Sequence, residues 1–225
     1  VASGLAKNYL KPGDEILITQ LDHEANRGPW LNQRRHGIVV REVLLEEDGS
    51  LDYADLEKKI SEKTRVIAIG LASNIFGTVN EIDRVRQLAY EVGALLVVDG
   101  VHFLPHLLTD IRAIDCDFLL CSAYKFYGPH VGILYSRPGA LDRLDTDRLR
   151  VQTQNAPYRI ERGTLNHAAL AGVSAAVDFI ASNGEGTTLR EKIVSAMGHI
   201  QKYERSLAQQ LYLGLRDLDG VDIYG

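Results

Sequence analysis

The sequence has 225 residues, which corresponds to roughly one and a half domains of typical size. Hydrophobic residues make up 45% of it and charged residues 24%, as in ordinary globular proteins, and 25 basic against 30 acidic residues give a net charge of −5. We expect no nucleic-acid partner, because proteins that bind nucleic acids present an excess of basic residues. No apolar run approaches the roughly 20 residues of a membrane span, so we expect no membrane partner either.

The chain has only two cysteines, Cys116 and Cys121, and both lie in an apolar segment. Their spacing fits neither a disulfide framework nor a metal site, so we predict no bound metal. We expect a reducing, cytoplasmic setting, in which both thiols are buried and inert.

Both ends of the sequence resemble interrupted elements. There is no initiator Met, residues 1–10 are typical of the end of a helix, and residues 221–225 are typical of a strand that is beginning. We therefore expect a chain that is truncated at both ends. We find no signal peptide.

Apolar runs alternate with helical patterns along the chain. The runs predict strands at residues 15–20, 38–44, 65–71, 94–99, 117–121 and 131–136. Helical spacing predicts helices at residues 24–35, 53–60, 81–92, 167–182 and 188–218, the first of them kinked or started by Gly28-Pro29. Strands that alternate with helices indicate βαβ units and a mostly parallel sheet.

Polar side chains follow several of the predicted strands. In open α/β sheets, ligands bind outside the carboxyl ends of the strands, so these residues are the candidates for a site. They are His23, Ser73 with Asn74, Asp99 with His102, and Ser122 with Lys125.

Asp99 and Lys125 together suggest a specific chemistry. A lysine in a partly apolar pocket can lose its proton and act as a nucleophile, and a carboxylate can hold a ring nitrogen protonated. These are the two protein groups that pyridoxal phosphate requires. Taken alone, the spacing of the two residues favours the simpler alternative, a surface lysine and an aspartate that caps a helix.

Five segments together resemble one known family. They are residues 22–26 (DHEAN), 72–80 (ASNIFGTVN), 97–102 (VVDGVH), 122–135 (SAYKFYGPHVGILY) and 162–166 (RGTLN). In this order they resemble the motifs of class V aminotransferases, and among these the cysteine desulfurases.

The resemblance implies the architecture of the whole chain. It implies an α/β fold, the large domain of a fold-type I pyridoxal-phosphate enzyme, with a mostly parallel seven-stranded sheet flanked by helices. Residues 1–187 would form this cofactor-binding domain, and residues 188–225 a linking helix and the start of a small α/β C-terminal domain. The family carries a phosphate-binding turn before the segment that corresponds to residue 1 and most of the small domain after residue 225.

The resemblance also assigns catalytic roles. Lys125 would bind the cofactor covalently and move the proton at the substrate Cα, and Asp99 would pair with the pyridine nitrogen. His23 would stack on the cofactor ring and act in proton transfer, since an imidazole titrates near neutral pH. A surface or capping role for His23 stays open.

The remaining assignments concern cofactor binding. Asn74 and His102 would donate to the phenolic oxygen of the cofactor, although Asn74 also suits a turn and His102 suits packing. Ser122 and Tyr124 would bind the phosphate. His102 stands where desulfurases usually have Gln, and Tyr124 where they commonly have His, which suggests a divergent branch.

Thr164 would reach the phosphate of the neighbouring subunit's cofactor, which implies a homodimer, and its alternative is a turn residue. The expected activity is that of a cysteine desulfurase, which converts cysteine to alanine and passes sulfur to a cysteine thiol, and from there to an acceptor protein. Two alternatives stay open. One is another class V reaction on an amino acid, by an aminotransferase, an epimerase or a kynureninase-like lyase. The other is a non-catalytic scaffold or inactive fragment.

Overall fold

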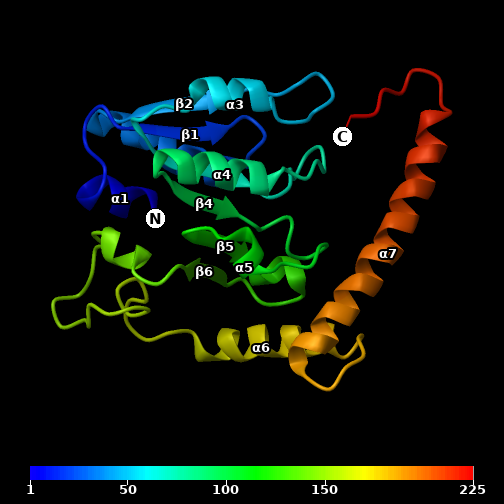
Figure 1. The fold of residues 1–225 in the computed structure, drawn as a ribbon. Coiled ribbons are helices and arrows are strands. Elements are labelled where there is room, and N and C mark those ends of the chain that lie inside the picture. The colour runs from blue at the N-terminus through cyan, green and yellow to red at the C-terminus, as the bar shows by residue number, and fades with distance from the viewer. Residues whose placement is uncertain (225) are drawn as a thin grey trace.

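A six-stranded sheet forms the centre of the molecule in the computed structural model, which describes residues 1–224 (Figure 1). The strands lie in the order β2-β1-β3-β4-β5-β6. β1 to β5 are parallel, and β6 runs antiparallel to β5. Their bounds are β1 Glu15–Thr19, β2 Val39–Val43, β3 Thr64–Gly70, β4 Leu95–Asp99, β5 Phe118–Ser122 and β6 Gly132–Ser136. All six strands predicted from apolar runs are confirmed, whereas the seventh strand implied by the resemblance is not found within residues 1–224.

Helices and 3₁₀ turns connect the strands. The helices are α1 Ala2–Asn8, α2 Gly28–Leu31, α3 Tyr53–Lys59, α4 Ile82–Val92, α5 Ile111–Ile114, α6 His167–Ala181 and α7 Leu189–Arg216. The 3₁₀ turns are η1 Glu24–Asn26, η2 Asn32–His36, η3 Ala123–Phe126 and η4 Ala140–Arg143.

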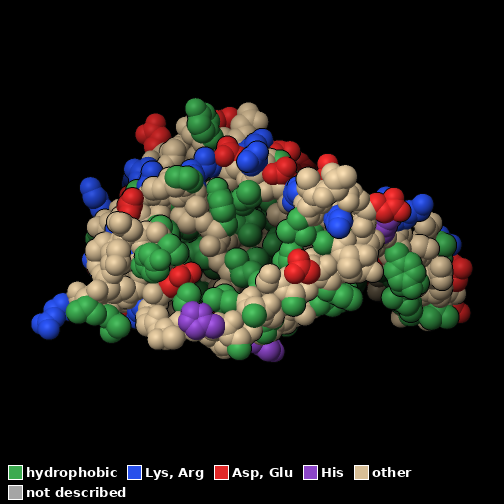
Figure 2. Space-filling model, turned by 90° about the horizontal axis from the view of Figure 1, so that it is seen from below, with side chains coloured by type: hydrophobic (Ala, Val, Ile, Leu, Met, Phe, Trp, Pro, Cys, Tyr) green, Lys and Arg blue, Asp and Glu red, His purple; other side chains and the backbone are tan. Residues whose placement is uncertain are grey.

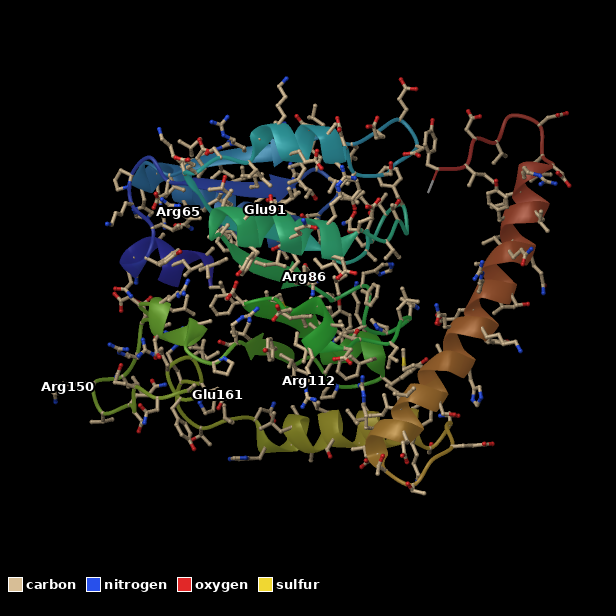
Figure 3. The ribbon with its side chains drawn as sticks, in the orientation of Figure 1. Arg65, Arg86, Glu91, Arg112, Arg150 and Glu161 are labelled. Carbon is tan, nitrogen blue, oxygen red and sulfur yellow. The ribbon has the colours of Figure 1, made fainter. Side chains whose placement is uncertain are left out.

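The sheet is covered on both faces, as continuous apolar strands require. Side chains alternate along each strand, so that Ile16 and Ile18 join one core and Leu17 joins the other. The first core includes α1, α2 and η4, and the second includes α3, α4 and α5. Arg86 of α4 donates to the carbonyl of Ala113 in α5 over 2.9 Å and so links two helices of the second layer (Figure 3).

Two sequence predictions are wrong in detail. The helix expected at residues 24–35 is three short segments, η1, α2 and η2, because Gly28-Pro29 interrupts the pattern and Pro29 takes a position at the start of α2. Residues 221–224 form no strand, since no neighbouring strand lies beside them, and Gly225 is outside the described residues.

Helix α7 extends away from the sheet (Figure 1). It begins with a capping box between Thr188 and Glu191, packs on α6, and is exposed at nearly every residue from 201 to 216. A hydrogen bond of 2.9 Å between Glu204 Oε2 and His106 Nδ1 joins it to the segment after β4. Within residues 1–224, no helix has the length and apolar character that crossing a membrane demands.

The surface seen from below is hollowed, and hydrophobic side chains gather in the hollow (Figure 2). Large apolar side chains are also exposed on α6, among them Leu170 and Phe179.

Candidate active site

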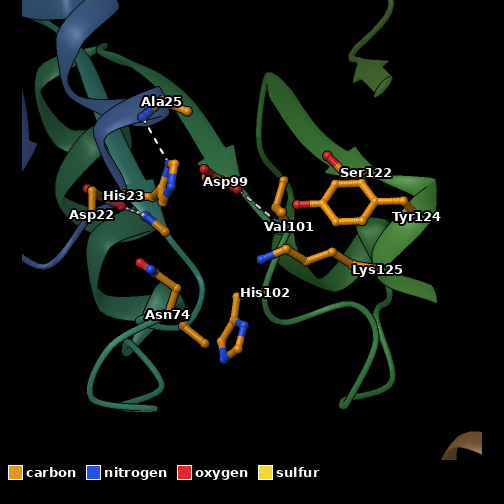
Figure 4. A pocket seen from close by; sticks show the side chains of 12 residues that line it. Asp22, His23, Ala25, Asn74, Asp99, Val101, His102, Ser122, Tyr124 and Lys125 are labelled. Carbon is orange, nitrogen blue, oxygen red and sulfur yellow. Dashed lines mark hydrogen bonds between the residues drawn. The ribbon is translucent and has the colours of Figure 1, made fainter. Parts of the chain in front are cut away.

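A pocket lies at the carboxyl ends of β1, β3, β4 and β5 (Figure 4). Its lining residues are Asp22, His23, Ala25, Gly70, Ala72, Asn74, Asp99, Val101, His102, Ser122, Tyr124 and Lys125. Seven of the eight site residues predicted from the sequence are therefore brought together, and Thr164 is not among them. The location agrees with the general position of ligand sites in parallel α/β sheets.

Lys125 lies in the tight connection between β5 and β6. Gly128 permits this turn, because a Cβ there would lie 2.9 Å from both the Cβ and the carbonyl oxygen of Ala123. Tyr127 adopts a left-handed backbone with φ 69°, and its ring packs edge-on against Phe179 of α6. Helix α6 thus supports the turn from below, and the Lys125 amine extends into the pocket (Figure 4).

Asp99 is the last residue of β4 and faces the same pocket. Its Oδ1 accepts a hydrogen bond of 2.9 Å from the Val101 backbone, which fixes the carboxylate and leaves Oδ2 available. Burial raises the pKa of Asp99 above its usual range, and the charges of His23 and Lys125 partly oppose this effect. A cationic group beside Oδ2 would therefore be strongly favoured.

His23 follows β1 and has the capping role that the sequence left open for it. Its Nδ1 accepts a hydrogen bond of 3.0 Å from the Ala25 backbone and caps η1. The proton of the neutral ring is therefore on Nε2, because Nδ1 is an acceptor. His23 lies on the side of the pocket opposite Lys125 (Figure 4).

Asn74 and His102 lie at the lower rim of the pocket in Figure 4. Asn74 sits in a loop after β3 that is fixed by its neighbour, since Ser73 Oγ accepts hydrogen bonds of 3.2 Å from two following backbone amides. Burial lowers the pKa of His102, and the nearby His106 and Lys125 lower it further. His102 is therefore a neutral imidazole at physiological pH.

Ser122 and Tyr124 flank Lys125 on the β5 side. Ser122 is the last residue of β5, and the Tyr124 ring stacks on His130 with a centroid distance of 4.7 Å. Within residues 1–224 no hydrogen bond engages the Ser122 hydroxyl, the Tyr124 hydroxyl or the Lys125 amine. Three polar groups are thus available to a ligand on one wall.

Comparison with known proteins identifies the family. A model of the family described as Aminotransferase class-V matches residues 1–225. The chain belongs to the class-V aminotransferases. The resemblance predicted from five sequence motifs is confirmed.

Two curated relatives of this class-V chain are the cysteine desulfurase of Pectobacterium atrosepticum, 33% identical, and the probable cysteine desulfurase of Halalkalibacterium halodurans, 31% identical. Both alignments cover 100% of this chain and 56% of the relative. The chain thus spans about 56% of the length of these relatives.

Solved structures agree with this family membership. The cysteine desulfurase of Escherichia coli matches with a TM-score of 0.83 and 28% identity, over 97% of this chain and 56% of that one. The apo cysteine desulfurase of Thermococcus onnurineus matches with a TM-score of 0.84 and 26% identity, over 100% of this chain and 56% of that one. The predicted α/β fold of fold-type I enzymes is confirmed.

The pocket of this class-V chain fits pyridoxal phosphate. That cofactor requires an amine for its aldehyde, an acid for its ring nitrogen and donors for its phosphate. Lys125 supplies an amine, Asp99 a carboxylate whose pKa is raised by burial, and Ser122 a hydroxyl. The pocket thus offers one group for each of these three requirements.

Thr164 lies away from the pocket, exposed in the loop before α6. The prediction that it serves a neighbouring subunit stays a prediction.

Both cysteines of the chain are buried, as expected, with 1% and 6% of Cys116 and Cys121 exposed. Burial raises the pKa of Cys116 to about 12 and that of Cys121 to about 11. A thiol reacts as its thiolate, so neither cysteine is reactive at neutral pH.

Sequence reasoning missed one polar residue of the pocket, Asp22. Its carboxylate accepts hydrogen bonds from the Thr19 hydroxyl at 2.7 Å and from the Gly70 backbone at 2.5 Å. Burial raises the pKa of Asp22 to about 6, and the charge of Asp99 contributes to the increase. Its position next to His23 was the available signal, but an acid after a strand is too common to single out.

Proposed function

We propose that this chain is the cofactor-binding part of a pyridoxal-phosphate enzyme that acts on an amino acid, with the activity of a cysteine desulfurase. The observation that carries the proposal is the convergence of Lys125 and Asp99, from separate strand ends, on one pocket. The cysteine desulfurase relatives support the choice of reaction.

Each residue would contribute one physical task. When bound, pyridoxal phosphate supplies an electron sink for the bond that breaks at the substrate Cα. Lys125 holds the cofactor and then moves the proton at the substrate Cα. Asp99 keeps the ring nitrogen protonated, because its carboxylate gains a cationic partner in a buried setting.

The other residues would orient the cofactor. His23 covers one face of the ring, with Nε2–H directed by the capping bond on Nδ1. Asn74 and His102 donate to the phenolic oxygen, which a neutral His102 does through one N–H. Ser122 and Tyr124 hold the phosphate.

A homodimer is part of the proposal. Thr164 lies outside its own pocket and is exposed, so it is free to reach the phosphate in a partner subunit. The exposed apolar residues of α6 support a covered surface on this side of the molecule.

The sulfur acceptor would not be Cys116 or Cys121, since both thiols are buried and protonated. In the proposed reaction the C–S bond of cysteine breaks, the sulfur forms a persulfide on another thiolate, and alanine leaves with a proton in its place. An acceptor protein would then take the sulfur. A cytoplasmic location suits two reduced thiols.

The burial of both cysteines also favours a second candidate function. A chain without a reactive thiol of its own is equally suited to another class V reaction, such as transamination, epimerisation or a kynureninase-like cleavage. These reactions use the same lysine and carboxylate and require no acceptor thiol.

We also propose a division of the chain at residues 187 and 188. Residues 1–187 would bind the cofactor. Residues 188–225 would link to a small C-terminal domain, since α7 packs on α6 and is exposed at nearly every residue from 201 to 216.

The experiment incubates the protein with pyridoxal phosphate and cysteine and measures sulfide and alanine together. Equal amounts of both products support desulfuration. Turnover of cysteine without alanine favours the second candidate, because alanine forms from cysteine only when the C–S bond breaks. Alanine without free sulfide means that the sulfur is held as a persulfide, and it still supports desulfuration. Borohydride reduction followed by mass spectrometry should locate the cofactor on Lys125, and the absence of any cofactor uptake would exclude both.

A further inference from the structure

Asp22 bridges the ends of two strands. The register between β1 and β3 ends at the pair of Leu17 and Ile67, so the backbone N–H of Gly70 lies beyond the last strand partner. Asp22 Oδ1 accepts from this N–H at 2.5 Å, and Oδ2 accepts from the Thr19 hydroxyl at 2.7 Å. The carboxylate thus replaces the strand that has ended and ties β1 to β3.

Both backbone polar groups of Gly70 form hydrogen bonds with side chains. Its N–H donates to Asp22, and its carbonyl accepts 2.7 Å from the Asn80 side chain, which is buried. A Cβ at position 70 would lie 2.7 Å from Asp22 Oδ1. The close approach of the carboxylate therefore depends on glycine at this position.

Burying the Asp22 carboxylate lowers the stability of the fold, so a purely structural role does not explain it well. Burial of a carboxylate is costly, which is why the pKa of Asp22 is raised to about 6, and Asp99 adds a like charge nearby. A neutral amide of the same shape could make the same two contacts. A buried titratable side chain that lines the pocket is a candidate for a role at the site.

The residue that follows Asp22 in the chain is His23. The capping bond from Ala25 sets the rotation of the His23 ring, but the position of the whole turn depends on its attachment to the sheet. Asp22 supplies that attachment, and both residues lie on the same side of the pocket in Figure 4.

We propose that Asp22 is a positioning residue of this site: its carboxylate fixes the turn that carries His23 to the end of β3, and so holds the imidazole over the pocket opposite Lys125. The inference rests on the proposed function, because the imidazole is held toward the bound cofactor. Shape and hydrogen bonding, rather than charge, perform this task.

The test compares pyridoxal-phosphate affinity in four variants. Asp22→Ala loses affinity by roughly 10- to 100-fold, the range expected when a site residue is displaced by about 1 Å. Asp22→Asn restores affinity to within about threefold, since an amide keeps both contacts. Gly70→Ala loses as much as Asp22→Ala, although it retains the carboxylate. Asp48→Asn, which changes an exposed turn aspartate, is the control and leaves affinity unchanged.

A double-variant comparison shows whether Asp22 acts through His23. His23→Ala alone weakens binding and reduces the circular dichroism of the bound cofactor. In the His23→Ala background, adding Asp22→Ala should cause no further loss in either measurement. Thermal melting of every variant separates loss of fold from loss of position.

Three results would overturn the inference: wild-type affinity in Asp22→Ala, an Asp22→Asn variant as weak as Asp22→Ala, or additive losses in the double variant. The failure of the proposed function has a different signature. In that case the wild-type protein itself takes up no pyridoxal phosphate.

Discussion

The two sides of the pocket are built differently. On the β1–β3 side, hydrogen bonds occupy the Asp22 carboxylate, His23 Nδ1 and both polar atoms of the Gly70 backbone. On the β5 side, the polar ends of Ser122, Tyr124 and Lys125 have no hydrogen-bond partner within residues 1–224. One wall is fixed by the protein, and the other offers its groups to a ligand.

The difference suggests that one wall positions the site and that the other wall carries its reacting groups. A site needs supporting groups whose contacts are already made, and reacting groups whose contacts are made only with the ligand. Changes on the β5 wall should therefore reduce activity and leave stability intact, whereas changes on the β1–β3 wall should affect stability as well.

The largest effect is expected from Lys125→Ala. The amine makes no hydrogen bond or ion pair within residues 1–224, so melting temperature should stay unchanged while turnover falls by about 10³-fold or more, as for the loss of a group that transfers a proton. Turnover with cysteine and thermal melting are the two measurements. Lys202→Ala, on the exposed face of α7, is the control. A clear drop in melting temperature would show that this wall is structural too.

Asp99→Asn should weaken cofactor binding by roughly 10- to 100-fold, since a hydrogen bond to a charged group contributes about 1.5–3 kcal/mol. The amide oxygen can still accept from the Val101 backbone, so the fold is retained. Equilibrium titration with pyridoxal phosphate measures the change. Unaltered affinity would contradict a role for Asp99 at the ring nitrogen.

The pH dependence of stability should reveal the Asp22 carboxylate. The folded chain holds the Asp22 proton up to about pH 6 and the unfolded chain releases it near pH 3.8, so its pKa is raised on folding. The stabilisation is therefore fully present below about pH 3.8 and is lost as the pH rises through about 6. Relative to the wild type, Asp22→Asn should gain on the order of 2 kcal/mol between pH 4 and pH 8.

Denaturant unfolding at several pH values measures this gain. Asp48→Asn should produce no such relative change between pH 4 and pH 8, because hydrogen bonding with Ser50 lowers the pKa of Asp48 and so places its titration below this range. A constant difference between Asp22→Asn and the wild type across this range would mean that Asp22 is not buried as described.

Asn80→Ala should cost about 1–3 kcal/mol, because the Gly70 carbonyl loses its buried partner. Asn8→Ala removes a similar bond at an exposed position and should cost much less. Denaturant unfolding compares the two. Equal costs would mean that the β1–β3 wall is no more dependent on its hydrogen bonds than the surface is.

The smallest effect is expected from Tyr124→Phe, which removes one hydroxyl from the free wall. Cofactor affinity should fall roughly threefold to tenfold, the effect of one hydrogen bond, with no change in melting temperature. Tyr90→Phe, at an exposed position of α4, is the control. An unchanged affinity would assign Tyr124 to packing on His130 alone.

The sequence predicts the strands and the edge where the pocket lies, because continuous apolar runs and the polar residues after them reflect local chemistry. His23, Asn74, Asp99 and Lys125 could be found in this way. The antiparallel direction of β6 could not, since apolar content carries no information about direction.

The failures share a cause in tertiary context. Residues 221–224 have the composition of a strand but no neighbour to pair with. The role of Asp22 can be recognised only from its hydrogen bond with Gly70, which is 48 residues away in the chain. Thr164 was found from a motif, and a single chain gives no contact that reveals its role.

The reversal of direction between β5 and β6 has a consequence for sequence change. The pairing of Ser122 with Gly132 and of Cys121 with Ile133 fixes both ends of the segment that carries Lys125. One inserted or deleted residue there would shift the register of the edge strand or withdraw the amine from the pocket. Tolerance of insertions should therefore be lowest between Ser122 and Gly132. In an insertion scan of the whole gene, functional variants with an insertion in this segment should be absent.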